Sequence, residues 1–158
     1  MQYHATIREL PACIVYYKQG VVKQFADYGA FVLQSAQECR AANPNILCVE
    51  PDYCYISYLD PEYREQDVAI EYAQAVTERG VETETIRFKS LASVSAVSVY
   101  HQGAYQRLRD AYAFAMQFVE QNGYEQVESA REQYIDGAWN TQNEADYLTE
   151  IQIPVRRK

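Results

Sequence analysis

Residues Leu148 to Val155 read LTEIQIPV. Apolar and polar residues alternate along it, which is typical of a β-strand that buries one face. An earlier stretch, from Ile70 to Val76, reads IEYAQAV. The two stretches align without a gap, with Val76 on Val155. The same strand therefore occurs twice in the chain, which indicates an internal duplication.

The segments before these strands repeat as well. Tyr17 to Gly20 reads YKQG, and Tyr100 to Gly103 reads YHQG, at nearly the same separation in the chain as the two strands. After each of them, apolar residues recur every three or four positions, which predicts an amphipathic helix. Asn43-Pro44 and Asn122-Gly123 end these two helices. The two stripes are Phe25, Tyr28, Val32, Ala36 and Cys39, and Tyr105, Leu108, Tyr112, Ala115 and Val119.

Runs rich in Val, Ile and Tyr predict the strands. They cover residues 12–17, 53–58, 68–76, 94–100, 128–135 and 148–155. The order strand, helix, strand, strand occurs twice, so we predict an α+β fold made of a duplicated βαββ unit. In it, two helices cover one face of an antiparallel sheet, and a ligand cleft lies at the pseudo-twofold axis. We expect residues 1–158 to form one domain, with halves at about 1–80 and 81–158.

Charge and hydropathy exclude several classes of protein. The chain of 158 residues carries 22 acidic and 14 basic side chains, for a net charge of −8. An acidic surface repels phosphate backbones, so we expect no direct binding of nucleic acid by this chain, whereas a lipophilic cation is attracted. No apolar run is long enough to span a membrane and no signal peptide is recognisable, so we expect a cytoplasmic protein without a membrane partner.

The cysteines do not form a metal-binding pattern. Their spacing contains no CxxC pair, and the chain has only 2 histidines to complete a ligand set. We therefore expect neither a metal site nor another cofactor. Without a secretory signal, we expect reduced thiols. The four residues are Cys13, Cys39, Cys48 and Cys54.

Tyrosine is over-represented, with 15 Tyr against 5 Phe and 1 Trp. A tyrosine combines a rigid apolar ring with a hydroxyl that needs a partner, which suits a wet pocket lined by aromatic side chains. Half-exposed strands also favour tyrosine. Composition alone leaves both interpretations open.

Alternation along each strand sorts the side chains onto two faces of the sheet. If apolar β-branched residues mark the side under the helices, then Ile151, Ile56 and Ile135 point to the helices. The residues that alternate with these markers then lie on the open face, where they predict an aromatic cage with carboxylates at its floor. A solvated polar face is the alternative. The set is Tyr53, Tyr55, Glu132, Tyr134 and Glu150.

Glu132 is the favoured binding residue of this set. A carboxylate among aromatic rings is costly unless it meets a cation or its pKa rises. Trp139 lies in a polar loop just after the strand of Glu132, where it either anchors the loop or folds over the cleft as a lid. His101, at a strand end, is interpreted as a hydrogen-bonded structural histidine in preference to a catalytic base.

Several of these segments together resemble the GyrI-like domain, the effector-binding module of MerR-type and AraC-type bacterial transcription regulators. The resemblance covers essentially the whole chain, and its closing TEIQIPV is its most specific part. It rests on His101 to Tyr105, Asn122-Gly123-Tyr124, Arg131 to Ile135, Leu148 to Val155, and the predicted hairpin from Glu62 to Glu71.

The resemblance implies a duplicated βαββ fold whose cleft binds a small organic ligand, often a lipophilic cation or an aromatic drug-like molecule. It implies that Glu132 faces the cation, and that Tyr53, Tyr55, Tyr134 and Tyr147 form aromatic walls. The regulators also carry a DNA-binding helix-turn-helix, for which we expect no room in this chain. A DNA-binding domain in a full-length parent, or a homodimer, is therefore an expected partner.

Two alternatives stay open beside ligand sensing. Some stand-alone members of the family resemble hydrolases that open cyclopropane-containing toxins, and in such an enzyme Glu132 and Trp139 are the candidate catalytic pair. The third alternative is a protein-interaction module that shields an enzyme from DNA-like or toxin partners, which the acidic charge permits. Turnover of a cyclopropane substrate separates the enzyme from the sensor.

Overall fold

The computed structural model describes residues 2–60, 64 and 66–158. Contacts divide the chain into two compact units. The middle unit comprises residues 11–93, and the terminal unit joins the segment up to Leu10 to residues 94–158. The boundary between the units thus follows Ser93 instead of residue 80. That both units act as one domain stays a prediction, and residues 62, 63 and 65 of the predicted first hairpin lie outside the described residues.

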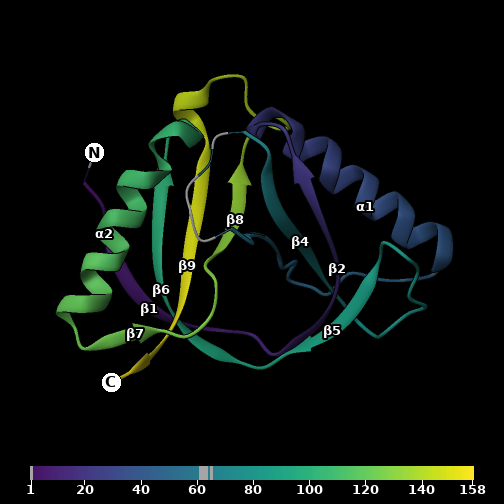
Figure 1. Ribbon diagram of the computed structural model, residues 1–158, viewed down its shortest axis with the longest axis horizontal. Coiled ribbons are helices and arrows are strands. Elements are labelled where there is room, and N and C mark those ends of the chain that lie inside the picture. Colours follow the sequence, from purple (N-terminus) through teal and green to yellow (C-terminus); the bar gives the residue numbers. More distant parts are fainter. Residues whose placement is uncertain (1, 61–63, 65) are drawn as a thin grey trace. The chain divides into compact units, whose positions relative to one another are not determined.

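The middle unit is an antiparallel sheet with one long helix. Its elements are β2 (Cys13–Val22), η1 (Phe25–Asp27), α1 (Tyr28–Ala42), β3 (Cys54–Tyr58), β4 (Val68–Val76) and β5 (Arg87–Leu91). The strands are hydrogen-bonded in the order β5-β2-β4-β3. The helix α1 contacts β2, and Figure 1 shows it along this unit.

The terminal unit has the same plan. Its elements are β1 (Ala5–Leu10), β6 (Val94–Gln102), η2 (Tyr105–Arg107), α2 (Leu108–Gln121), β7 (Tyr124–Gln126), β8 (Arg131–Asp136), η3 (Glu144–Asp146) and β9 (Leu148–Arg157). The strand order is β1-β6-β9-β8, and β7 pairs with the end of β9. The helix α2 contacts β6 and β9 and lies along them in Figure 1.

The two units repeat the order strand, helix, strand, strand. In the middle unit this order is β2-α1-β3-β4, and in the terminal unit it is β6-α2-β8-β9. All described pairings are antiparallel. The predicted α+β fold with a duplicated βαββ unit is therefore confirmed.

The register corrects one of the two sequence matches. In the alignment that puts Val76 on Val155, Glu71 corresponds to Glu150. Glu71 pairs with Gln19, whereas Glu150 pairs with Tyr100. Gln19 thus corresponds to Tyr100 and not to Gln102, as the YKQG and YHQG match suggests. The glycine that both segments share does not mark equivalent positions. Gly20 lies within β2, where an added Cβ would come 2.6 Å from the Phe31 ring.

Each unit receives its edge strand from the neighbouring repeat in the sequence. The strand β1 precedes β2 in the chain but pairs with β6. In the same way, β5 precedes β6 but pairs with β2. Neither strand was predicted, because most side chains of β1 are exposed and those of β5 are mainly polar. These exchanged strands supply two basic side chains that matter below, Arg8 and Lys89.

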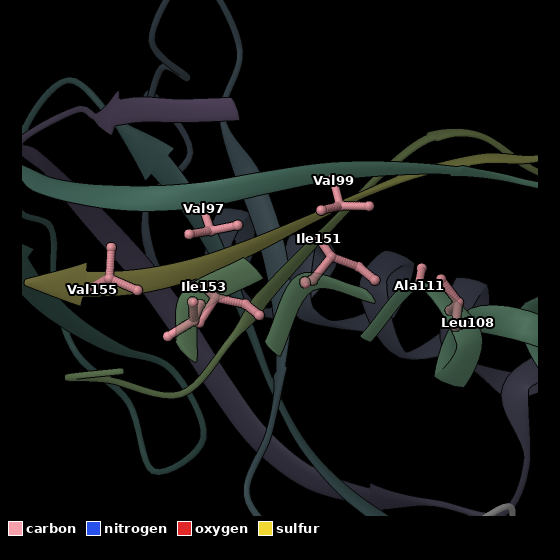
Figure 2. Packing of buried hydrophobic residues seen from close by; sticks show 9 residues of the cluster. Val97, Val99, Leu108, Ala111, Ile151, Ile153 and Val155 are labelled. Carbon is pink, nitrogen blue, oxygen red and sulfur yellow. The ribbon is translucent and has the colours of Figure 1, made fainter. Parts of the chain in front are cut away.

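The core of the terminal unit lies between α2 and one face of its sheet (Figure 2). Val97 and Val99 in β6 pair with Ile153 and Ile151 in β9, so all four side chains share this face. Four residues of α2 pack against them, namely Leu108, Ala111, Ala115 and Val119. The prediction that Ile151 lies under the helix is confirmed, and Ile153 and Val155 lie in the same core.

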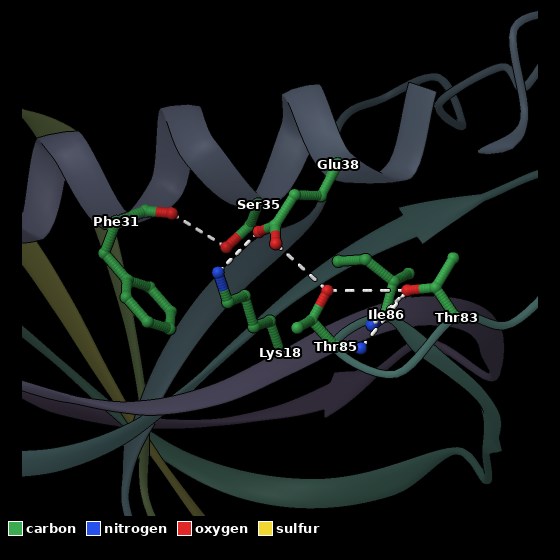
Figure 3. Close-up of polar contacts among 7 residues, drawn as sticks. All are labelled: Lys18, Phe31, Ser35, Glu38, Thr83, Thr85 and Ile86. Carbon is green, nitrogen blue, oxygen red and sulfur yellow. Dashed lines mark hydrogen bonds and ion pairs between the residues drawn. The ribbon is translucent and has the colours of Figure 1, made fainter. Parts of the chain in front are cut away.

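In the middle unit, an ion pair attaches α1 to the sheet (Figure 3). Lys18 Nζ in β2 donates to Glu38 Oε2 in α1 at 2.5 Å, and Thr85 donates to the other carboxylate oxygen at 3.0 Å. Lys18 also lies over the Phe31 ring. The hydrogen bond from Lys18 lowers the pKa of Glu38 below its ordinary value. These contacts identify the face of β2 that α1 covers.

Within the described residues, no disulfide links the four cysteines and no group of three or more His, Cys, Asp and Glu side chains is arranged to hold a metal ion. Burial raises the pKa of the Cys54 thiol to about 11. A thiol with a raised pKa is a weak nucleophile. The described helices include none with the length and apolar character needed to cross a membrane.

Candidate ligand-binding site

Glu132 lies in β8 and is 1% exposed. It stands directly opposite Ile151 in β9. Residues that are directly opposite share a face of the sheet, and Ile151 belongs to the core beneath α2. Glu132 therefore lies on the face that the helix covers. The prediction that it lies on the open face is wrong.

The error came from Ile135 as a marker of the buried side. The β8–β9 ladder is irregular between Tyr134 and Asp136, so Ile135 falls at a bulge, and it is 38% exposed. A bulge leaves a residue unpaired and re-aims its side chain. Tyr134 stands opposite Thr149 and shares the parity of Glu132, so it also lies on the helix-covered face.

Two phenols hold the Glu132 carboxylate. Tyr112 Oη in α2 donates to Oε2 at 2.5 Å, and Tyr134 Oη donates to Oε1 at 2.5 Å. Each carboxylate oxygen has further lone pairs beyond the one that a phenol occupies. The two hydrogen bonds thus fix the carboxylate in place.

Two more tyrosines complete the site, which we call the Glu132 cluster: Glu132, Tyr105, Tyr112, Tyr134 and Tyr147. The Tyr105 ring centroid lies 5.5 Å from that of Tyr134 and 5.2 Å from that of Tyr147. Burial, followed by the nearby Tyr147 and Glu132, raises the pKa of Tyr105 to about 12. Its ring therefore stays a neutral phenol at physiological pH, which preserves an apolar aromatic surface beside the carboxylate.

Sequence reasoning placed Tyr134 and Tyr147 in the site but missed Tyr105 and Tyr112. Both belong to the second apolar stripe, from which only an amphipathic helix was predicted. Their separation by two helical turns was the available signal, because residues seven apart lie on one helix face. In the structure, η2 and α2 present them to Glu132 and Tyr134.

The duplicated unit shows what the fold requires at the position of Glu132. In the middle unit, Ile56 stands opposite Tyr72, as Glu132 stands opposite Ile151 in the terminal unit. Tyr72 and Ile151 correspond in the alignment of the two last strands. Ile56 is 2% exposed, so the equivalent position is a buried apolar one. The fold does not need a carboxylate here, and Glu132 therefore has another role.

Two other buried carboxylates, Glu150 and Glu71, form ion pairs. Glu150 accepts from Arg8 at 2.7 Å and from Ser98 at 2.6 Å. In the equivalent place, Glu71 accepts from Lys89 at 2.8 Å. Glu150 has the opposite strand parity to Ile151, so it lies on the face away from α2 and does not join Glu132 as predicted. These ion pairs fasten the exchanged strands β1 and β5.

Tyr53 and Tyr55 belong to the middle unit. Their ring centroids are 5.8 Å apart, and both side chains are buried. Tyr55 stands opposite Ala73, and Ala73 stands opposite Tyr17 in β2, so Tyr55 lies on the face away from the one that Lys18 and α1 share. Their placement on that face agrees with the sequence interpretation. That they line one site together with Glu132 stays a prediction.

Trp139 lies in the loop between β8 and β9 and is 61% exposed. Its indole ring lies across Gly137, where an added Cβ would collide with the ring. Asn140 holds this loop by accepting from the Gly137 amide and donating to Asp136, both at 2.9 Å. Trp139 is thus not buried as an anchor, and the depression that it lines consists of residues of its own loop.

His101 is a hydrogen-bonded structural residue, as expected. Its Nε2 lies 3.0 Å from the carbonyl oxygen of Ala104, which can only accept, so Nε2 carries the proton. Its Nδ1 then accepts from the Tyr3 hydroxyl at 2.9 Å. Both ring nitrogens are occupied and the side chain is 1% exposed, which leaves no nitrogen for a catalytic base.

Known structures share this architecture. The chain is 42% identical to the C-terminal domain of EcmrR, with a TM-score of 0.90 and 100% of both chains covered. It matches EcmrR in a DNA complex equally well, but there it spans 58% of that chain. A hydrolase from Listeria innocua is 10% identical, with a TM-score of 0.66 over 96% of this chain and 91% of that one.

One further structure is SAV2435 bound to tetraphenylphosphonium, at 18% identity and a TM-score of 0.55 over 99% of this chain and 94% of that one. The Listeria and SAV2435 similarities concern the fold alone. No curated protein matches the chain. The family model described as a GyrI-like small molecule binding domain matches residues 4–156. The chain belongs to the family of GyrI-like small-molecule-binding domains.

Proposed function

We propose that this chain is the effector-binding part of a transcription regulator and that it binds a lipophilic organic cation at the Glu132 cluster. The observation that carries the proposal is a buried carboxylate at a position where the other repeat has Ile56. Burying a carboxylate costs free energy that an apolar residue does not cost. A ligand that needs the negative charge is the reason to keep it.

The chemistry of the cluster suits such a cation. The rings of Tyr105, Tyr134 and Tyr147 lie close together beside the carboxylate. Aromatic faces attract a cation, most strongly where water is excluded. The net charge of −8 adds a long-range attraction for a positive ligand.

The relatives support a regulatory setting. EcmrR occurs in a complex with DNA, and this chain spans 58% of the EcmrR chain in that complex. We propose that DNA binding belongs to another domain of a full-length parent, or to a partner in a homodimer, and that this chain senses the ligand in the cytoplasm. Its acidic charge agrees with a domain that does not itself bind nucleic acid.

Calorimetry with tetraphenylphosphonium and neutral triphenylphosphine oxide tests the proposal. We expect Glu132→Gln to weaken binding of the phosphonium by about 10- to 100-fold, the scale of a charge-assisted contact, and to change binding of the oxide little. Glu120→Gln removes one exposed negative charge from α2 and serves as the matched control. Equal phosphonium affinities for Glu132→Gln and the parent protein would exclude the carboxylate as the recognition element.

Hydrolysis at Glu132 is the second candidate function, since a carboxylate held by two phenols is also a catalytic group. Hydrogen bonds to both oxygens favour the ionised form. Such a group is better suited to activate a water molecule than to protonate a strained ring. A product burst from a cyclopropane substrate that Glu132→Gln abolishes, with ligand binding retained, would establish the hydrolase.

A further inference from the structure

Thr149 lies next to the Glu132 cluster and is fully buried, with 0% exposure. It stands between His101 in β6 and Tyr134 in β8, directly opposite both. Directly opposite residues share a face, so its side chain lies on the face that α2 covers. Glu132 is two residues from Tyr134 along β8, which makes Thr149 and Glu132 diagonal neighbours in the ladder.

The hydroxyl of Thr149 is a buried polar atom that has no hydrogen-bond partner within the described residues. The polar atoms beside it are already used. His101 bonds to Tyr3 and to Ala104 through its two nitrogens, and the Tyr134 hydroxyl donates to Glu132. A buried hydroxyl without a partner costs free energy, so its presence calls for an explanation.

The fold does not require this hydroxyl. In the alignment of the two last strands, Thr149 corresponds to Ile70 in β4, which is also fully buried. Ile70 stands opposite Tyr58, as Thr149 stands opposite Tyr134. Two apolar positions of the middle unit are therefore polar in the terminal unit, Glu132 and Thr149, and they are neighbours on one face. Their coincidence points to one polar ligand group that uses both.

We propose that Thr149 is a specificity-determining residue whose hydroxyl accepts a hydrogen bond from an N–H of the cation bound at Glu132. The inference rests on the proposed function and narrows its ligand class to protonated amines. An ammonium N–H can bond to the carboxylate or to the hydroxyl, whereas a quaternary ammonium or a phosphonium offers no N–H. The latter cations gain charge attraction and ring contacts but leave Thr149 without a partner.

The test compares benzyldimethylammonium with benzyltrimethylammonium, which carry the same charge near pH 7 and differ in one N–H. We expect the parent protein to bind the protonated amine tighter by about 3- to 10-fold, the scale of one hydrogen bond. Thr149→Val keeps the shape and removes the hydroxyl, so the ratio of its affinities for the two cations should fall to about one. Thr149→Ser retains the hydroxyl and serves as the control, with the preference of the parent protein.

Each outcome decides the inference. A parent protein that binds both cations without preference overturns it, and no variant is needed for that result. A preference that persists unchanged in Thr149→Val also overturns it, while Glu132 as the cation partner stands. If Glu132→Gln leaves the affinity for both cations unchanged, the proposed function fails, whatever the ratio.

Discussion

Glu132 and Ile56 occupy equivalent buried positions in two copies of one structural unit. Each stands opposite a residue of the last strand of its βαββ repeat. This residue is Ile151 in β9 for Glu132 and Tyr72 in β4 for Ile56. The hydroxyls of Tyr112 and Tyr134 surround the carboxylate. Tyr134 has a counterpart in Tyr58, which accepts from Tyr28 at 3.2 Å instead. The duplication thus supplies an internal control for the role of Glu132.

Placing the residue of one repeat into the other tests whether Glu132 serves stability or ligand binding. Glu132→Ile should change the free energy of unfolding by no more than about 2 kcal/mol, because loss of a buried charge offsets the two phenols left without an acceptor. Its affinity for tetraphenylphosphonium should fall at least as much as in Glu132→Gln. Urea denaturation followed by circular dichroism measures the first effect, and calorimetry the second.

The reverse change, Ile56→Glu, should destabilise the protein by about 3–5 kcal/mol, since it buries a charge without a prepared partner. Similar losses of stability for both exchanges would mean that Glu132 is a structural residue.

The bond between Tyr112 and Glu132 should appear as a coupling energy. Tyr112→Phe leaves one oxygen of the buried carboxylate without its phenol donor, so we expect a loss of about 1–3 kcal/mol in unfolding free energy. In a Glu132→Ile background the same change should cost almost nothing. Tyr100→Phe, at a tyrosine that is 47% exposed, is the control. Equal costs in the two backgrounds would show that the hydrogen bond contributes no stability.

The ion pair between Lys18 and Glu38 should make stability depend on pH. The folded-state pKa of Glu38 is lowered, mainly by its hydrogen bond from Lys18. The pair therefore stabilises the fold above the unfolded pKa of Glu, and this contribution is lost as the pH falls through the lower folded pKa. We expect Glu38→Gln to cost up to about 1 kcal/mol at pH 7.

This difference should disappear in strong acid, where both proteins carry a neutral side chain at position 38. Chemical denaturation between pH 7 and acid measures it, with Glu120→Gln on α2 as the control. A difference that is constant over the whole range would contradict an ionic origin.

Trp139 should report on its loop without contributing much to the binding of a cation. The ring is 61% exposed and lies against Gly137, so acrylamide should quench its fluorescence readily. We expect Trp139→Phe to leave the affinity for tetraphenylphosphonium within about twofold, since the single substitution removes no described contact to Glu132. A large loss of affinity, or quenching that the ligand suppresses, would restore Trp139 as a lid.

The duplicated fold was predictable because its central strands and both helices bury one face, and burial leaves a periodic pattern. Leu148 to Val155 shows it most clearly, and its Ile and Val residues pack in the core as expected. The edge strands β1 and β5 escaped prediction, since an exposed edge has no need to alternate. Their exchange between repeats depends on contacts that are remote in sequence.

The candidate site was predictable by residue but not by face. Glu132, Tyr134 and Tyr147 were found because a carboxylate among tyrosines is chemically unusual. Ile135 was used as a marker of the buried side, but it is 38% exposed and alternation from Glu132 puts it on the face away from α2. Tyr112 was predicted only as part of an amphipathic helix, because the helical period does not show that its hydroxyl reaches Glu132.

The central claim is that the Glu132 carboxylate meets the positive charge of the ligand. A crystal structure of the chain with tetraphenylphosphonium tests it most directly. We expect a phosphorus atom within about 4–6 Å of a Glu132 carboxylate oxygen, the range in which opposite charges favour each other's ionised form, with phenyl groups against Tyr105 and Tyr134. A ligand bound elsewhere, without contact to Glu132, would contradict this assignment of the carboxylate.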